Sequence, residues 1–233
     1  ETGKGEEKTP LFVQYIKNRR KEEKGKSDIE IEISNNEIAQ AFVLRTSDFS
    51  SRNTNISLIV TSKILYNLNA KNFRKYFLDK FSLNKVFELA PVRKEVFNNS
   101  NDKAVAPASV LFYKYAQNEN TDKNIVKHIT LKPSRFFSLF KVFTIQRGDY
   151  KEVVQEKIKT YDYLWKVLVY GSYLDFNLIK RLKKDFEPIS NVISNKEKFV
   201  YGQGIQVGGG NKNDISRHIG KKYINARKDI KPF

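Results

Sequence analysis

The spacing of hydrophobic residues in the first third of the chain predicts three amphipathic helices. Apolar residues recur every three or four positions in 9–24, 35–50 and 70–81, so each segment presents one apolar face when it is coiled. Ser34 and Glu37 have the spacing of a capping box at the start of the second helix. The residues on these faces are Leu11, Phe12, Tyr15 and Ile16, then Ile38, Ala41, Phe42, Arg45 and Phe49, then Phe73, Phe77 and Phe81.

Short apolar runs predict strands around the third helix. The segment 56–62 is rich in β-branched residues, too short for a helix and apolar on both faces, which is typical of an interior parallel strand. The runs 85–89 and 108–115 are also predicted to be strands. The order strand, helix, strand and then a further strand is a βαβ unit with a hairpin-like partner, so we expect an α/β sheet.

Helical spacing returns after the last of these strands. Ser134, the pair Asp149 and Glu152, and the pair Ser172 and Asp175 stand where helix caps are expected, and they predict a helical connector. In the first helix of this connector, core packing is the preferred interpretation of the phenylalanines, and a base-stacking platform is the alternative. The residues expected to face inward are Phe136, Phe137, Phe140 and Phe143, then Val153, Ile158, Tyr161 and Trp165, then Leu174, Leu178, Leu182 and Phe186.

The segment 201–214 is rich in glycine, but it matches neither common nucleotide motif. Its last glycine is not followed by the Lys-Ser/Thr pair of a Walker loop, and a dinucleotide fingerprint needs a glycine where Val207 stands. The segment is either an ordinary surface turn or a loop whose amides approach a phosphate, with Lys212 and Arg217 beside it.

Composition excludes several classes of protein. The chain has 233 residues, and 39% of them are hydrophobic, which is enough for a folded core. No apolar run approaches the roughly 20 residues of a membrane helix, and the polar start lacks a signal peptide, so we expect a cytoplasmic protein without a membrane partner. Cysteine is absent and the two histidines, His128 and His218, are far apart, so we expect no metal site. No hydrolytic motif is complete, and no catalytic residue can be assigned.

The net charge of the chain indicates a polyanionic partner. The formal net charge is +17, and the surplus of lysine and arginine extends through both halves of the chain. Cations that neutralise nucleic-acid phosphates release condensed counterions, so such a surface favours a polyanion. A basic surface without a nucleic-acid partner is the alternative.

Several sequence blocks occur in a characteristic order, namely 55–63, 72–78, 85–89, 95–98 and 106–113, followed by 211–214 and 229–233. In this order the first five resemble the second half of the catalytic domain of DNA adenine-N6 methyltransferases, in particular the large type IIG restriction–modification enzymes. The last two resemble the start of their target-recognition domain.

The resemblance implies a Rossmann-like sheet of seven strands, of which this chain would supply the fifth, sixth and seventh, the last one antiparallel. In that family S-adenosylmethionine lies on a glycine-rich turn after the first strand, and a Pro-Pro-aromatic motif after the fourth strand holds the target adenine. This chain has no Pro-Pro dipeptide and no glycine turn of that kind before Ile56. The resemblance therefore implies that both motifs lie upstream, and that this chain alone does not catalyse the reaction.

One aromatic position of the family matches a residue of this chain. By resemblance, Phe97 in block 95–98 is the side chain that stacks on the flipped adenine, and a phenylalanine tucked into the core is the alternative. Arg93 and Lys94 beside it are expected to contact DNA phosphates or to be solvated. The C-terminal residues expected to bind DNA are Lys212, Arg217, Lys221 and Lys222.

These expectations divide the chain into part of a catalytic domain (1–133), a helical connector (134–200) and the start of a target-recognition domain (201–233). The implied function is that of part of a site-specific adenine-N6 methyltransferase, which acts on double-stranded DNA with S-adenosylmethionine and with other domains of its parent chain. The alternative is a basic DNA-binding module without catalysis.

Overall fold

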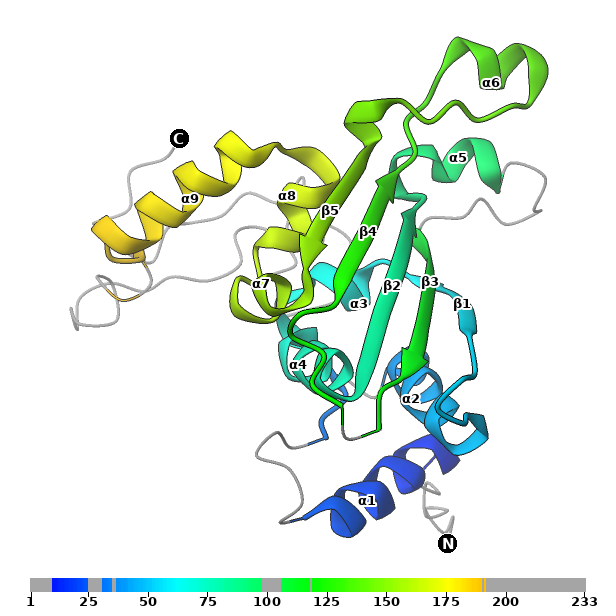
Figure 1. Ribbon diagram of the computed structural model, residues 1–233, viewed down its shortest axis with the longest axis vertical. Coiled ribbons are helices and arrows are strands. Elements are labelled where there is room, and N and C mark those ends of the chain that lie inside the picture. The colour runs from blue at the N-terminus through cyan, green and yellow to red at the C-terminus, as the bar shows by residue number, and fades with distance from the viewer. Residues whose placement is uncertain are drawn as a thin grey trace, which may run out of the picture. The chain divides into compact units, whose positions relative to one another are not determined.

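A computed structural model describes residues 10–24, 31–34, 37–97, 106–117, 119–189 and 191 (Figure 1). The chain divides after Leu178 into two compact units, and all the described strands belong to the first. The strands are β1 (Ile56–Thr61), β2 (Phe81–Glu88), β3 (Ala108–Tyr115), β4 (Ile125–Thr130) and β5 (Tyr150–Val154). The helices are α1 (Leu11–Glu23), α2 (Ile38–Arg45), α3 (Lys63–Tyr66), α4 (Lys71–Lys80), α5 (Arg93–Val96), α6 (Arg135–Phe140), α7 (Gln155–Thr160), α8 (Leu164–Tyr170) and α9 (Tyr173–Asp185), with 3-10 turns η2 (Thr46–Phe49), η3 (Leu68–Ala70), η4 (Ala90–Val92) and η5 (Arg147–Asp149).

The strands form one mixed sheet in the order β1-β3-β2-β4-β5. β3 is antiparallel to both of its neighbours, while β2 and β4 are parallel, so β1, β2 and β4 all run in the same direction. β5 is antiparallel to β4. The prediction of an α/β protein is confirmed as a mixed sheet combined with helices.

β1 corrects one prediction, because it is not an interior parallel strand. It pairs with β3 in antiparallel register, and within the described residues β3 is its only strand neighbour. Ile59 on this strand is 69% exposed. The run of β-branched residues therefore indicated a strand correctly, but the pattern does not distinguish a central strand from an edge strand.

The core lies under one face of the sheet, against α3, α4 and α8 (Figure 1). Alternate residues of β3, such as Leu111 and Tyr113, are buried on this face. The rings of Phe73 and Phe77 on α4 stack with 5.9 Å between centroids, and Phe77 meets Tyr113 edge-on at 5.2 Å. The predicted burial of the phenylalanines in 70–81 is confirmed, and each such side chain contributes about 1.5–3 kcal/mol to the free energy of unfolding.

Two buried polar side chains connect the helices to the sheet. Gln155 at the start of α7 donates to the carbonyl oxygens of Leu78 and Phe81 at 2.6 and 2.8 Å, and accepts from the backbone N–H of Leu83 at 3.0 Å. Arg74 on α4 pairs with Asp162 at 2.5 Å before α8. Both side chains are almost fully buried, so they fix the register of the elements that they join.

The second predicted helix begins later than expected, and a different face of it is buried. α2 starts at Ile38, and Ser34 exchanges hydrogen bonds with the Gln40 side chain rather than forming a capping box. Phe42 is 60% exposed, and the buried residues of α2 are Gln40, Ala41, Val43 and Leu44. The expected apolar face thus lies largely in solvent, because a polar glutamine takes part in the buried face instead.

The region after β3 departs most from the prediction. Residues 125–130 form β4, which was not expected, and residues 150–154 form β5 rather than the start of a helix. Asp149 does accept a hydrogen bond from the N–H of Gln146 at 2.9 Å, but it closes the 3-10 turn η5. The capping pattern at Asp149 therefore stands before the strand β5 and not before a helix. Residues 150–154 adopt an extended conformation because they pair with β4.

The last described helix keeps its predicted cap but not its predicted face. Ser172 donates from its N–H and its hydroxyl to Asp175 at 2.6 and 2.8 Å. The expected inward residues are exposed, and Phe176 is the buried residue of α9. These exposed residues are Leu174, Leu178, Leu182 and Phe186. The proposed division of function at residues 133 and 200 stays a prediction, and within the described ranges no helix has the length and apolar character of a membrane span.

Candidate nucleic-acid interface

The carboxyl ends of β1, β2 and β4 meet at one edge of the sheet, because these strands run in the same direction. In open α/β sheets ligands bind outside this edge. Here β1 is followed by α3, β2 by η4 and α5, and β4 by a segment that contains α6. We refer to this last segment, residues 131–149, as the α6 excursion.

α5 carries the residues that the sequence singled out. Val92, fully buried, packs in a cluster with Leu89, Ile129 and Leu131, and Val96 lies against the same cluster. This packing fixes α5 at the carboxyl end of β2 (Figure 1).

The polar side of α5 and the residue that follows the helix, Phe97, remain accessible. Arg93 donates to the carbonyl oxygen of Ala90 at 3.3 Å, and Lys94 is exposed. Phe97 is half-buried, and its N–H donates to the carbonyl oxygen of Arg93 at 3.1 Å. The structure therefore brings Arg93, Lys94 and Phe97 together on one turn, while the role of the Phe97 ring stays a prediction. Glu95 is half-buried on the same turn and moderates its positive charge.

A buried carboxylate lies at the same edge and was missed by the sequence analysis. Glu88, the last residue of β2, accepts hydrogen bonds from the hydroxyl of Ser62 at 2.6 Å and from the N–H of Ala90 at 2.9 Å. Burial raises the pKa of Glu88, and these hydrogen bonds offset part of that rise. Burial and the nearby Glu88 charge also raise the pKa of Tyr66 to about 12. A glutamate that ends an apolar run was the available signal.

His128 is the second buried group that was missed. It lies on β4 beside Trp165, with 6.5 Å between ring centroids, and its Nδ1 is 3.4 Å from the hydroxyl of Thr130. Burial lowers the pKa of His128 to about 3, with a smaller contribution from Lys151, so the ring is neutral at pH 7. Among the described residues, no cluster of histidines and carboxylates has the composition of a metal site.

The phenylalanines of the α6 excursion do not form a single core stripe. Phe137 and Phe143 stack on each other with 4.2 Å between ring centroids, and Phe137 is 9% exposed. Phe136 and Phe140 point into solvent and are 59% and 64% exposed. The expectation that the four face the core is thus wrong for two of them. Lys141 adopts a left-handed conformation (φ 58°) that ends α6 and turns the chain back, so Phe143 packs on the Phe137 side of the helix and leaves Phe136 and Phe140 uncovered.

The remaining predicted DNA-binding residues, namely Lys212, Arg217, Lys221 and Lys222, lie outside the described residues. The described part also does not fit the expected cofactor. Its glycines are Gly148, before β5, and Gly171, after α8. Neither stands in a turn from a parallel strand to a helix, so no S-adenosylmethionine site can be built from these residues.

A hollow away from this edge lies between β5, α8 and the start of α9. It has a volume of about 570 Å³ and is lined by Val153, Leu168 and Phe176 among others. Lys151 borders it, but its ammonium donates to the carbonyl oxygens of Leu168 and Gly171 at 2.5 and 2.8 Å. The lysine therefore stabilises the end of α8.

No protein-family model and no curated protein matches this chain. Solved structures that resemble it include two from restriction–modification systems. One is the type IIG restriction endonuclease BpuSI, with 16% identity and a TM-score of 0.44 over 67% of this chain and 19% of that one. The other belongs to a study of the assembly of a type I R-M system, with 10% identity and a TM-score of 0.40 over 71% and 40%. The chain thus spans less than half the length of either, and neither likeness assigns it to a family.

Proposed function

We propose that this chain is part of a DNA adenine-N6 methyltransferase of the restriction–modification type. In this proposal its sheet edge holds DNA next to an active site whose reacting groups lie in other parts of the parent protein. The observation that carries the proposal is the turn of α5, where Arg93, Lys94 and Phe97 stand together at the carboxyl end of a parallel strand.

The chemistry of this turn suits an extruded base. An enzyme that modifies a base in duplex DNA first pulls that base out of the stack. An aromatic side chain such as Phe97 then replaces part of the lost stacking, and cations such as Arg93 and Lys94 neutralise the flanking phosphates. The order of the sequence blocks and the antiparallel course of β3 between β1 and β2 agree with this proposal.

S-adenosylmethionine would supply the methyl group in the parent enzyme. Because the described residues do not fit this cofactor, we assign its binding, and the polar groups that hold the adenine amine, to sequence outside this chain. The same observation favours the second candidate, a DNA-binding module that positions DNA for a catalytic partner.

The proposal is tested by measuring DNA binding and methylation separately. We expect the 233-residue chain to bind duplex DNA with little sequence preference and with an affinity that falls steeply as salt rises. We expect no transfer of labelled methyl groups by this chain alone, and transfer by the full-length parent. Absence of DNA binding at low ionic strength would contradict both candidates. Binding without methylation by the parent would leave only the binding module.

A further inference from the structure

The α6 excursion is joined to β2 at its start, where the N–H of Leu131 donates to the carbonyl oxygen of Glu88 at 3.1 Å, and contacts between its own residues hold it together. At its start, Ser134 caps α6 by accepting a hydrogen bond from the N–H of Phe137 at 3.2 Å. Phe137 then packs on Phe143. At its end, Asp149 is buried and forms an ion pair with Lys132 at 2.7 Å. These contacts give α6 a defined position, so the side chains on its outer surface are held in a fixed arrangement.

The outer surface of α6 carries two large aromatic side chains. The rings of Phe136 and Phe140 lie one helical turn apart, with 5.6 Å between centroids, and Leu139 beside them is also exposed. A solvent-facing helix surface is usually polar, so an exposed cluster of this kind marks a contact surface. Its flat ring faces suit a partner that is itself flat and apolar.

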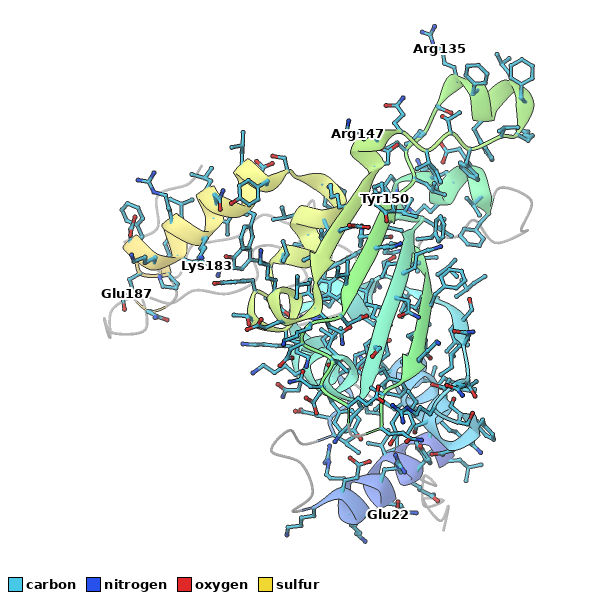
Figure 2. The ribbon with its side chains drawn as sticks, in the orientation of Figure 1. Glu22, Arg135, Arg147, Tyr150, Lys183 and Glu187 are labelled. Carbon is cyan, nitrogen blue, oxygen red and sulfur yellow. The ribbon has the colours of Figure 1, made fainter. Side chains whose placement is uncertain are left out.

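The charge around these rings indicates which partner fits. Every charged residue between Leu131 and Gly148 is basic, and Lys132 is already paired with Asp149. Arg135, Lys141 and Arg147 have no acidic partner among the residues that the structure describes. Figure 2 shows Arg135 at the outer end of α6 and Arg147 near the start of β5, both directed away from the sheet. The ammonium of Lys141 lies over the Phe137 ring, 5.6 Å from its centroid. Aromatic faces flanked by cations without acidic partners fit a nucleic acid.

The excursion shares its base with the candidate interface on α5. Phe143 lies against the same buried cluster that holds Val92 and Val96. Both segments leave the carboxyl edge of the sheet, one after β2 and the other after β4 (Figure 1). DNA that contacts Arg93 and Lys94 therefore lies on the side of the sheet from which α6 projects.

We propose that the α6 excursion is a second DNA contact, which binds bases that are not paired. Phe136 and Phe140 stack on these bases, and Arg135, Lys141 and Arg147 contact the flanking phosphates. This inference rests on the proposed function for its DNA partner, and it adds a site that prefers opened DNA. Apolar side chains inserted at an unstacked step stabilise such DNA at the cost of its base stacking.

The aromatic part is tested with two labelled DNAs of the same length and phosphate number, one fully paired and one with a central mismatched bubble. We expect the 233-residue chain to bind the bubble more tightly, by about 5-fold to 150-fold for each stacked base. The double variant Phe136→Ala/Phe140→Ala should lose this preference. Phe42→Ala on α2 removes a phenylalanine of similar exposure, 60%, and should keep it.

The cationic part has a different signature. The double variant Arg135→Ala/Arg147→Ala should weaken binding to both DNAs equally. It should also reduce the slope of log affinity against log salt by about 1.8, because each phosphate contact contributes about 0.9. All these side chains are exposed, so thermal melting should confirm that each variant is folded as the wild type is.

The two proposals fail in different ways. Equal affinity of the wild type for the two DNAs, or an unchanged preference in the Phe136→Ala/Phe140→Ala variant, would overturn the role of α6 alone. A variant that binds both DNAs normally but changes its oligomeric state would show that the rings contact protein instead, and would also overturn it. If the wild type fails to bind even paired duplex at low salt, the proposed function fails as well.

Discussion

Glu88 and His128 are buried titratable groups on neighbouring strands, and they affect stability in opposite directions. The pKa of Glu88 is raised in the fold, so the stability associated with its protonated form is complete below pH 4.5 and is lost as pH rises through the folded pKa. The pKa of His128 falls from 6.5 to about 3, so its contribution is complete above pH 6.5 and is lost as pH falls toward 3. Glu88 thus lowers the free energy of unfolding at high pH, and His128 lowers it at low pH.

This difference predicts how acid acts on the fold. Between pH 6.5 and 5 the free energy of unfolding should fall by up to about 1.4 kcal/mol per pH unit, because the unfolded His128 takes up a proton that the folded ring does not. His128→Gln should flatten this slope in urea titrations, and Glu88→Gln should not. An equal slope in the wild type and His128→Gln would assign the acid effect to other groups.

Phe97 offers a choice between two roles that substitutions can separate. If its ring stacks on an extruded adenine, Phe97→Ala in the full-length parent should cost about 1–3 kcal/mol in the flipped complex. Phe97→Trp and Phe97→Tyr should retain much of the activity, because each keeps an aromatic face. A core role predicts instead that Phe97→Ala lowers stability by roughly 3–5 kcal/mol and that tryptophan strains the site.

Thermal melting and base-flipping fluorescence of the three variants decide between these roles. A Phe97→Ala protein that melts far below the wild type but flips the base normally while folded would make Phe97 a packing residue. In that case Arg93 and Lys94 would be the remaining DNA contacts on α5.

At the scale of elements, Gln155 joins α7 to the end of α4 and to the start of β2, which follows it directly. Its four hydrogen bonds use all the capacity of the amide group, with Asn124 donating the fourth at 2.8 Å. The strand partner of β2 shifts register between Leu83 and Lys85, next to this amide. The side chain therefore satisfies backbone groups of both the end of α4 and the start of β2.

Replacing this amide should destabilise the protein strongly. Gln155→Ala removes a donor from the carbonyl oxygen of Phe81 and the side-chain acceptor of the Leu83 N–H, at about 1–3 kcal/mol for each buried group left unsatisfied. The carbonyl oxygen of Leu78 keeps a hydrogen bond from the hydroxyl of Thr121 at 2.7 Å. Gln155→Glu keeps the shape but removes both donors, so it should also be destabilising, and more so at neutral than at acidic pH. Chemical denaturation at two pH values measures this. A Gln155→Glu protein as stable as the wild type at pH 7 would contradict the assigned donor role.

The elements also show where sequence patterns determine structure and where they do not. Phenylalanines at four-residue spacing predicted α4 correctly, because only a helix brings them onto one buried face. β4 was missed because Lys127 and His128 interrupt its apolar run, although His128 is buried. β5 was mistaken for a helix because its capping pattern serves a 3-10 turn. Pairing across the sheet decides both cases, and pairing is not a local property.

The candidate site was predictable to a similar extent. The resemblance selected Phe97, and Arg93 and Lys94 were singled out beside it. Arg93 and Lys94 lie in α5 and Phe97 at its C-cap, while their roles stay predictions. The exposure of Phe136 could not be predicted, because the sequence pattern of α6 does not distinguish it from its buried neighbour Phe137. The left-handed turn at Lys141 brings Phe143 back onto Phe137, and the sequence pattern did not indicate this turn.

At the scale of the whole molecule, the net charge of +17 should govern the association with DNA that we propose. Removal of the α5 cations, as in Arg93→Ala/Lys94→Ala, should weaken duplex binding without changing the preference for bubble DNA that we assign to α6. Fluorescence anisotropy over a salt series measures both quantities. If the α5 variant bound duplex DNA as the wild type does, the DNA contact would lie on other basic surfaces.

Among the described residues, the edge of β1 away from β3 has no strand partner, and this has a practical consequence for keeping the protein in solution. At low ionic strength the charge of +17 keeps molecules apart, but at about 1 M salt charges are screened beyond roughly 3 Å. Two β1 strands with Ile59 exposed can then pair edge to edge. We expect light scattering by concentrated samples to rise with salt, and Ile59→Lys to suppress this rise. High salt, the usual remedy for nucleic-acid contamination during purification, would thus shorten the storage life of this protein.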